Sequence, residues 1–159
     1  MDSMVKIYLK RAENEINAAK ILFEISNSDE NKKEFNIEEG TTFYSSVISH
    51  SYYAIFYSAK GLLLTEHIKT SSPEVHKKTY EEFKKSFVDT GILDVNLLNI
   101  YKKMIIRADQ LLQVFKDEKW KRGHFTYETI PQANKSPADE SLRHAKLFAS
   151  NIRKIIENN

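Results

Sequence analysis

The sequence predicts an all-α protein, an up-and-down antiparallel four-helix bundle with one additional short helix. In three long segments, apolar residues recur at spacings of three and four, which is the period of a helix that buries one face. A fourth segment, residues 41–67, is apolar on nearly every side, as expected of a helix in the centre of a bundle. Polar connections separate these segments, and no run alternates in the manner of a strand, so the helices are expected to pack antiparallel at about 20°.

Length and composition indicate one domain over residues 1–159. The chain has no cysteine, which excludes disulfides, thiolate metal sites and a cysteine nucleophile. Charged residues interrupt the first turns, and His50 and Lys60 interrupt the longest apolar stretch, so we expect no targeting signal, no membrane span and a cytoplasmic location. The net charge of +2 is too small to indicate a nucleic-acid-binding protein by itself.

The first two long helices are expected on either side of a loop. The first helix covers residues 2–26, and its apolar stripe consists of Val5, Leu9, Ala12, Ile16, Ala19 and Phe23. Residues 27–40 are polar and acidic and end at Gly40, which favours a loop. The central helix then covers residues 41–67, with Thr41 or Thr42 as the expected N-cap.

A short third helix is predicted after the sequence Ser71-Ser72-Pro73-Glu74, which combines capping-box spacing with a proline suited to the first turn. It is expected to end near Asp89, with Gly91 as its stop. Asp94 is the expected cap of the fourth helix. The apolar stripe of that helix consists of Leu97, Tyr101, Met104, Ala108, Leu111 and Phe115.

The last part of the chain is expected to be a long connection followed by a helix. Residues 117–135 lose the helical period and are expected to connect the fourth helix to the last one. The sequence Ser136-Pro137-Ala138-Asp139 is a second capping box and predicts the start of that helix. Its stripe consists of Ala138, Leu142, Ala145, Ala149, Ile152 and Ile156.

A local excess of basic residues lies between residues 101 and 124, where seven basic residues stand against three acidic ones. Basic side chains beside an aromatic ring suit phosphate contact and base stacking, and the alternative is a solvated loop with a docked tryptophan. The candidates for ligand or partner binding in this segment are Lys116, Lys119, Trp120, Lys121 and Arg122.

Two further candidates, Arg107 and Asp109, flank Ala108 of the fourth stripe and are therefore expected at the margin of the buried face. One interpretation is an ion pair between helices. The other is a polar groove that receives a phosphate or the side chain of a partner.

The central helix carries Tyr52, Tyr53, Phe56 and Tyr57 close to His50. At helical spacing, these aromatic residues favour core packing and a dimer interface over base stacking. His50 is expected to be hydrogen-bonded in the core rather than to act as a ligand or catalytic group.

The sequence implies no metal and no cofactor. No carboxylate lies three residues before any of the five histidines, as the di-iron motif of a helical bundle requires. Glu140 and His144 are four residues apart, but a single pair of this kind is typical of a surface interaction.

Residues 50–60, His-Ser-Tyr-Tyr-Ala-Ile-Phe-Tyr-Ser-Ala-Lys, resemble the most recognisable segment of the HEPN domain (higher eukaryotes and prokaryotes nucleotide-binding) in its small stand-alone prokaryotic form. The segments 11–20, 87–91, 107–109 and 138–148 are also similar to that family, so the resemblance covers almost the full length. It implies the same bundle of four helices with a short extra helix.

The resemblance also implies a function. Many HEPN proteins are dimers, and several are RNA-cleaving toxins paired with a nucleotidyltransferase-like antitoxin. Their cleavage motif is an arginine followed, after four to six residues, by a histidine, so that the arginine holds the phosphate and the histidine moves a proton. No arginine in this sequence is followed by a histidine at that spacing.

We therefore expect a non-catalytic HEPN-type domain without catalytic residues. It is expected to form a homodimer through its aromatic helix. It is also expected to act with a nucleotidyltransferase-like partner in a toxin–antitoxin-type pair, or to bind a nucleotide or RNA. The alternative is a metal-independent ribonuclease toxin with a rearranged site, in which His50 or His124 meets Arg107 in space.

Overall fold

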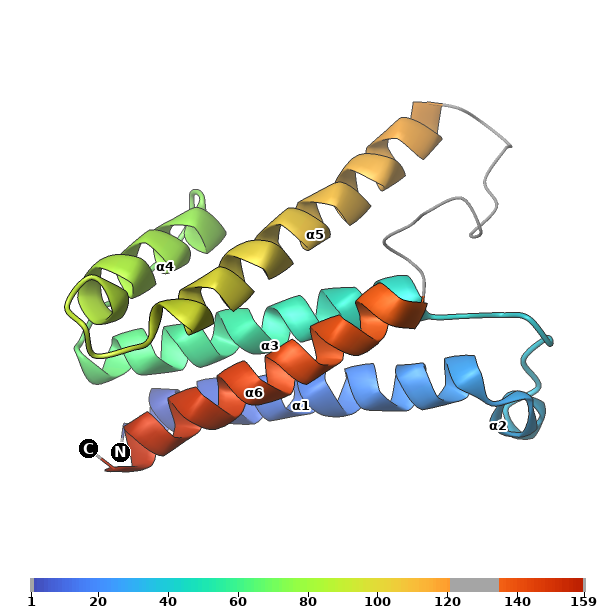
Figure 1. The fold of residues 1–159 in the computed structure, drawn as a ribbon, viewed down its shortest axis with the longest axis horizontal. Helices are drawn as coiled ribbons and strands as arrows, with labels where there is room; N and C mark the ends of the chain where they lie inside the picture. The colour runs from blue at the N-terminus through green and yellow to red at the C-terminus, as the bar shows by residue number, and fades with distance from the viewer. Residues whose placement is uncertain (1, 121–134, 159) are drawn as a thin grey trace.

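The computed structural model describes residues 2–120 and 135–158, with the backbone alone for residues 113–120, and all elements of this part of the chain are helical (Figure 1). The elements are α1 (Ser3–Asn27), α2 (Asp29–Glu34), α3 (Tyr44–Thr65), α4 (Val75–Phe83), the π-helical turn η1 (Lys84–Val88), α5 (Val95–Trp120) and α6 (Lys135–Asn158). The predicted all-α bundle is confirmed, with α1, α3, α5 and α6 as its long helices.

Helix α3 is the central element of the bundle. It contacts α1, α4, α5 and α6, and more than half of its 22 residues are buried. Ile48, Ala54 and Leu64 lie at widely different angles around its axis and are all buried, so the helix is buried on most of its sides. This confirms the interpretation of residues 41–67 as the core helix.

An aromatic cluster joins the short helix to the last two long ones. The rings of Phe83, Tyr101 and Phe148 lie 5.4–5.7 Å from one another between centroids. They come from α4, α5 and α6, and all three side chains are fully buried. The predicted stripes contain Tyr101 but neither phenylalanine. The stripe of the last helix takes Ala149 rather than its neighbour Phe148, and no stripe is predicted for the short helix that contains Phe83.

The segment between α1 and α3 differs from the expected loop. Residues 29–34 form the short helix α2, which begins because the Ser28 hydroxyl accepts a hydrogen bond from the Asn31 N–H at 3.2 Å. Neither threonine caps α3, which begins one residue after Phe43 without a side-chain cap. The Phe43 N–H instead donates to the hydroxyl of the buried Ser26 at 2.7 Å, so a tertiary contact replaces the local cap.

The short third helix begins later than its sequence indicates. Glu74 has a left-handed backbone with φ of 57°, which prevents the capping box, and α4 starts at Val75 and continues as η1 to Val88. Gly91, at φ of +77°, follows as the predicted stop. The Asp94 carboxylate accepts from the Asn96 N–H at 2.7 Å, which confirms the cap of the next helix.

Helix α5 extends through Trp120, so residues 117–120 are helical rather than part of the expected connection. Figure 1 shows α5 inclined to α3 and α6, with α4 beside its first half. The start of α1 and the end of α6 meet at one end of the bundle, where Leu9 and Ile156 both approach Gly61. None of the helices in the described part of the chain is long and apolar enough to cross a membrane.

Candidate functional site

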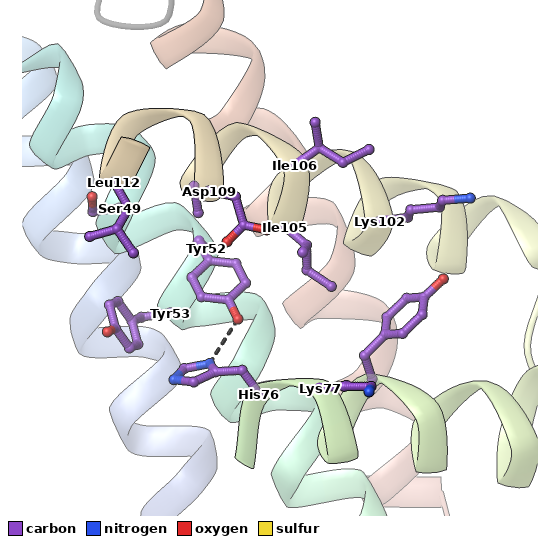
Figure 2. A pocket seen from close by; sticks show the side chains of 12 residues that line it. Ser49, Tyr52, Tyr53, His76, Lys77, Lys102, Ile105, Ile106, Asp109 and Leu112 are labelled. Carbon is purple, nitrogen blue, oxygen red and sulfur yellow. Dashed lines mark hydrogen bonds between the residues drawn. The ribbon is translucent and has the colours of Figure 1, made fainter. Parts of the chain in front are cut away.

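A cavity of about 690 Å³ lies between α3, α4 and α5 and is referred to below as the α3–α4–α5 cavity. Figure 2 shows its wall, to which all three helices contribute side chains. The residues that line it are Ser49, Tyr52, Tyr53, His76, Lys77, Tyr80, Lys102, Ile105, Ile106, Ala108, Asp109 and Leu112.

The floor of the cavity is a hydrogen-bonded pair that fixes α4 on α3. The Tyr52 hydroxyl lies 2.8 Å from Nδ1 of His76 (Figure 2). The His76 ring also stacks on Phe56, with centroids 4.2 Å apart. Since Tyr52 and Phe56 are buried, the histidine holds the beginning of α4 against an aromatic surface of the core helix.

The protonation states of this pair follow from its surroundings. Burial raises the pKa of Tyr52 well above its usual value, and Tyr53 and Asp109 add to that rise. Burial lowers the pKa of His76, the Lys60 charge lowers it further, and Asp109 opposes both. At neutral pH the tyrosine therefore keeps its proton and the imidazole is neutral, so the hydroxyl donates to Nδ1 and the ring proton is on Nε2.

One carboxylate and two ammonium groups border the cavity. Asp109 makes no hydrogen bond or ion pair with any residue of the described ranges, and Figure 2 shows it projecting from α5 toward Tyr52. Lys77 on α4 and Lys102 on α5 are exposed, and within residues 2–120 and 135–158 neither makes an ion pair. The cavity thus offers groups of both signs that have no ion-pair partner among the described side chains.

Exposed apolar side chains border the same cavity. Tyr53 is 39% exposed, Ile106 is 50% exposed and Leu112 is 55% exposed. Large apolar side chains that are exposed singly need no explanation, but a group of them around a concave surface is typical of a binding site.

Arg107 lies on the opposite side of α5 from this cavity and joins α5 to α6. Its guanidinium donates to the Glu140 carboxylate at 3.0 Å, to the Ser141 hydroxyl at 2.8 Å and to the Pro137 carbonyl at 3.2 Å. Only 14% of its side chain is exposed. Arg107 and Asp109 therefore do not share a site, because residues two apart on a helix face different directions.

Glu140 is the centre of this polar cluster. It also accepts a hydrogen bond from Lys103, and the imidazole of His144 lies 3.9 Å away. The hydrogen bond from Lys103 is the largest cause of a lowered pKa of Glu140, about 2; burial opposes it, and Arg107 lowers the pKa further. The carboxylate is therefore ionised at neutral pH and holds the Arg107 guanidinium in place.

The other sequence candidates lie elsewhere. Nδ1 of His50 is 2.6 Å from the Glu15 carboxylate, so this histidine joins α3 to α1. His124, Lys121 and Arg122 lie outside the described residues, as do the side chains of Lys116, Lys119 and Trp120.

Sequence reasoning missed the groups that α4 contributes, namely His76 and Lys77. His76 is 24 residues from Tyr52 in sequence, and no local pattern joins the two. Asp109 is the one cavity group with a charge that the sequence singled out, because it borders the buried stripe of its helix.

Comparison with known proteins shows the family. The HEPN domain family matches residues 5–155, and the chain therefore belongs to the HEPN family. A Methanocaldococcus jannaschii protein named "Putative toxin MJ0605" is 28% identical over 153 residues, which cover 96% of this chain and 89% of that protein. A second protein of that organism, named "Putative toxin MJ0142", is 42% identical over 55 residues, or 35% of each chain. No solved structure matches the chain.

Proposed function

We propose that the protein is the HEPN component of a toxin–antitoxin-type pair and acts by binding rather than by cutting RNA. Its ligand is a nucleotide or RNA, and its protein partner is a separately encoded nucleotidyltransferase-like antitoxin. The family and the names of the two relatives support the toxin–antitoxin part of this proposal.

The observation that carries the non-catalytic part is the separation of Arg107 from His50. Metal-independent RNA cleavage needs a cation at the phosphate and a proton-transferring group beside the ribose. Arg107 is bound by Glu140 of α6, and His50 is bound by Glu15 of α1. Each group is paired with a carboxylate on a different helix, which supports the proposal that Arg107 and His50 do not act together as one catalytic site.

If the proposed homodimer uses the aromatic helix, only some aromatic side chains of that helix are available for the interface. Tyr52 and Phe56 are buried inside the subunit, so of the four aromatic residues predicted for the interface Tyr53 and Tyr57 remain for a second copy. Light scattering of the purified protein measures the subunit number, and Tyr57→Ala tests the interface without changing a residue of the α3–α4–α5 cavity.

We also propose that the protein is cytoplasmic.

The proposed function is tested with total RNA and the purified protein. We expect RNA binding without cleavage, and equal binding by Arg107→Ala and His50→Ala after both variants are shown to fold. Cleavage that disappears in Arg107→Ala and in either His50→Ala or His124→Ala would instead establish the ribonuclease. Expression in cells, with and without a nucleotidyltransferase-like protein encoded in the same genome, tests the antitoxin part, and growth arrest that the partner relieves is the expected result.

A further inference from the structure

We propose that the α3–α4–α5 cavity binds one nucleotide, either free or within a single strand of RNA, and selects bases that carry an exocyclic amino group. This inference rests on the proposed nucleotide or RNA binding and adds the site and the base preference. It does not use the basic segment at residues 116–122, to which the sequence pointed.

The cavity has the size and wall that a single base with its sugar and phosphate requires. Its volume of about 690 Å³ falls within the range of roughly 300–1,000 Å³ that is usual for small-ligand sites. Tyr53 presents an exposed ring, and Leu112 and Ile106 extend the apolar surface on α5 (Figure 2). A base can stack on such a ring, and it would cover these exposed apolar side chains.

The base preference follows from Asp109. An ionised carboxylate accepts hydrogen bonds and donates none, and this one has no partner in the described part of the chain. The amino groups of adenine, cytosine and guanine are donors that match it, as in the contact of acidic side chains with the cytosine amino group. Uracil has no amino group and places carbonyl oxygens on both sides of its single ring N–H, so it brings acceptors toward the carboxylate.

The phosphate contact follows from Lys77 and Lys102. The two lysines lie on facing helices and border the same cavity, so both ammonium groups contribute positive charge at its border. Neither ammonium is neutralised by an ion pair within residues 2–120 and 135–158. His76 cannot supply this charge at neutral pH because burial lowers its pKa, so the lysines account for the attraction of an anion.

The test is calorimetric titration of the whole protein with adenosine, cytidine, guanosine and uridine monophosphates, and with inorganic phosphate. Cytidine monophosphate is expected to bind about tenfold more tightly than uridine monophosphate, the equivalent of one hydrogen bond to a charged group. Asp109→Asn can donate as well as accept, so it should reduce this ratio to near one. Equal affinities in the unchanged protein, or an unchanged ratio in Asp109→Asn, would overturn the proposal.

Matched lysine variants show whether a loss of affinity comes from the lost charge or from a loss of folded protein. Lys77→Gln is expected to weaken all four nucleotides to a similar degree, because it contacts the phosphate rather than the base. Lys78→Gln changes the next residue on the same helix, which does not line the cavity, and should leave the affinities unchanged. A melting curve for each variant shows that it folds, and equal weakening by both lysine variants would contradict the phosphate contact.

The remaining experiments show whether the nucleotide is free or part of an RNA strand. They also show whether a negative result contradicts this inference alone or the proposed function as well. Tighter binding of a short cytidine oligonucleotide than of the monophosphate indicates an RNA strand, and the reverse indicates a free nucleotide. If total RNA binds but is unaffected by Asp109→Asn and by competing monophosphate, the ligand site lies elsewhere and only this inference fails. If neither RNA nor any nucleotide binds, the proposed binding function fails with it.

Discussion

The Tyr52 hydroxyl and Nδ1 of His76 lie 2.8 Å apart and join the core helix α3 to the short helix α4. The pair forms the floor of the α3–α4–α5 cavity and fixes the position of Lys77, the next residue of α4. The stability of this part of the bundle is therefore coupled to the shape of the candidate site.

Tyr52→Phe is expected to reduce the free energy of unfolding by about 1 kcal/mol, because it removes one partly buried hydrogen bond and keeps the ring. Denaturant unfolding measures the change. Tyr53→Phe is the matched control, since its hydroxyl makes no hydrogen bond within the described residues. An equal loss in both variants would contradict a specific contribution from the Tyr52–His76 pair.

Tyr101→Phe is expected to stabilise the protein, in contrast to Tyr52→Phe. The Tyr101 side chain is 0% exposed and its hydroxyl has no hydrogen-bond partner in the part of the chain that the structure describes. Removing a buried, unpaired hydroxyl while keeping the ring contacts with Phe83 and Phe148 should raise the free energy of unfolding by about 1 kcal/mol. A lower melting temperature for this variant would show that the hydroxyl is paired.

Phe148→Ala is expected to cost about 3–5 kcal/mol, because it empties the centre of the aromatic cluster. Such a loss is a large part of the usual stability of a domain, roughly 5–15 kcal/mol. Leu147→Ala changes the neighbouring residue of the same helix, which is half exposed, and should change stability by less than about 0.5 kcal/mol. Similar unfolding midpoints for the two variants would contradict the burial of Phe148.

The pH dependence of stability should show a contribution from His76. Its pKa is lowered in the folded protein, chiefly by burial, so below the ordinary value of 6.5 the unfolded chain binds more protons and stability falls as the pH falls. The stabilisation relative to His76→Asn should therefore shrink from pH 7.5 to pH 5 in melting experiments. A stabilisation that stays the same over this pH range would contradict the contribution of His76.

Glu140 should affect the pH dependence of stability in a more acidic range than His76. Its pKa is lowered to about 2, first by Lys103 and then by Arg107, so its contribution is complete above the ordinary pKa of 4.5 and is lost as the pH falls toward 2. Glu140→Gln should cost about 1 kcal/mol at neutral pH. Asp139→Asn, which breaks an exposed ion pair with Arg143, should cost almost nothing. Equal effects at pH 7 would contradict the special role of Glu140.

The sequence is sufficient to predict the bundle because a helix that buries one face repeats its apolar residues every three or four positions. The stripe with Val5 and Leu9, the all-round apolar helix and the Asp94 cap are local patterns, and each is present in the structure. The α2 helix is not predictable in this way, because six polar residues carry no apolar period. The start of α3 depends on the contact between Phe43 and Ser26, which are 17 residues apart.

The candidate site is less predictable than the fold. Arg107 and Asp109 are both prominent in sequence, but helical geometry sends one toward α6 and the other toward the cavity. His76 and Lys77 become neighbours of Tyr52 only when α4 packs on α3. Pairing between distant segments creates the cavity, so only one of its charged groups, Asp109, stands out in sequence.

The meeting of α1 and α6 at one end of the bundle has a consequence for chain connectivity. Tyr8, Leu9 and Ile156 all lie around Gly61, so a short linker can join the end of α6 to the start of α1. New ends can then be opened at Gly40, where the backbone has φ of +85° and a side chain would meet nothing within 4 Å. A circularly permuted protein of this kind keeps every helix pair, because the packing depends on which helices are neighbours and not on their order along the chain.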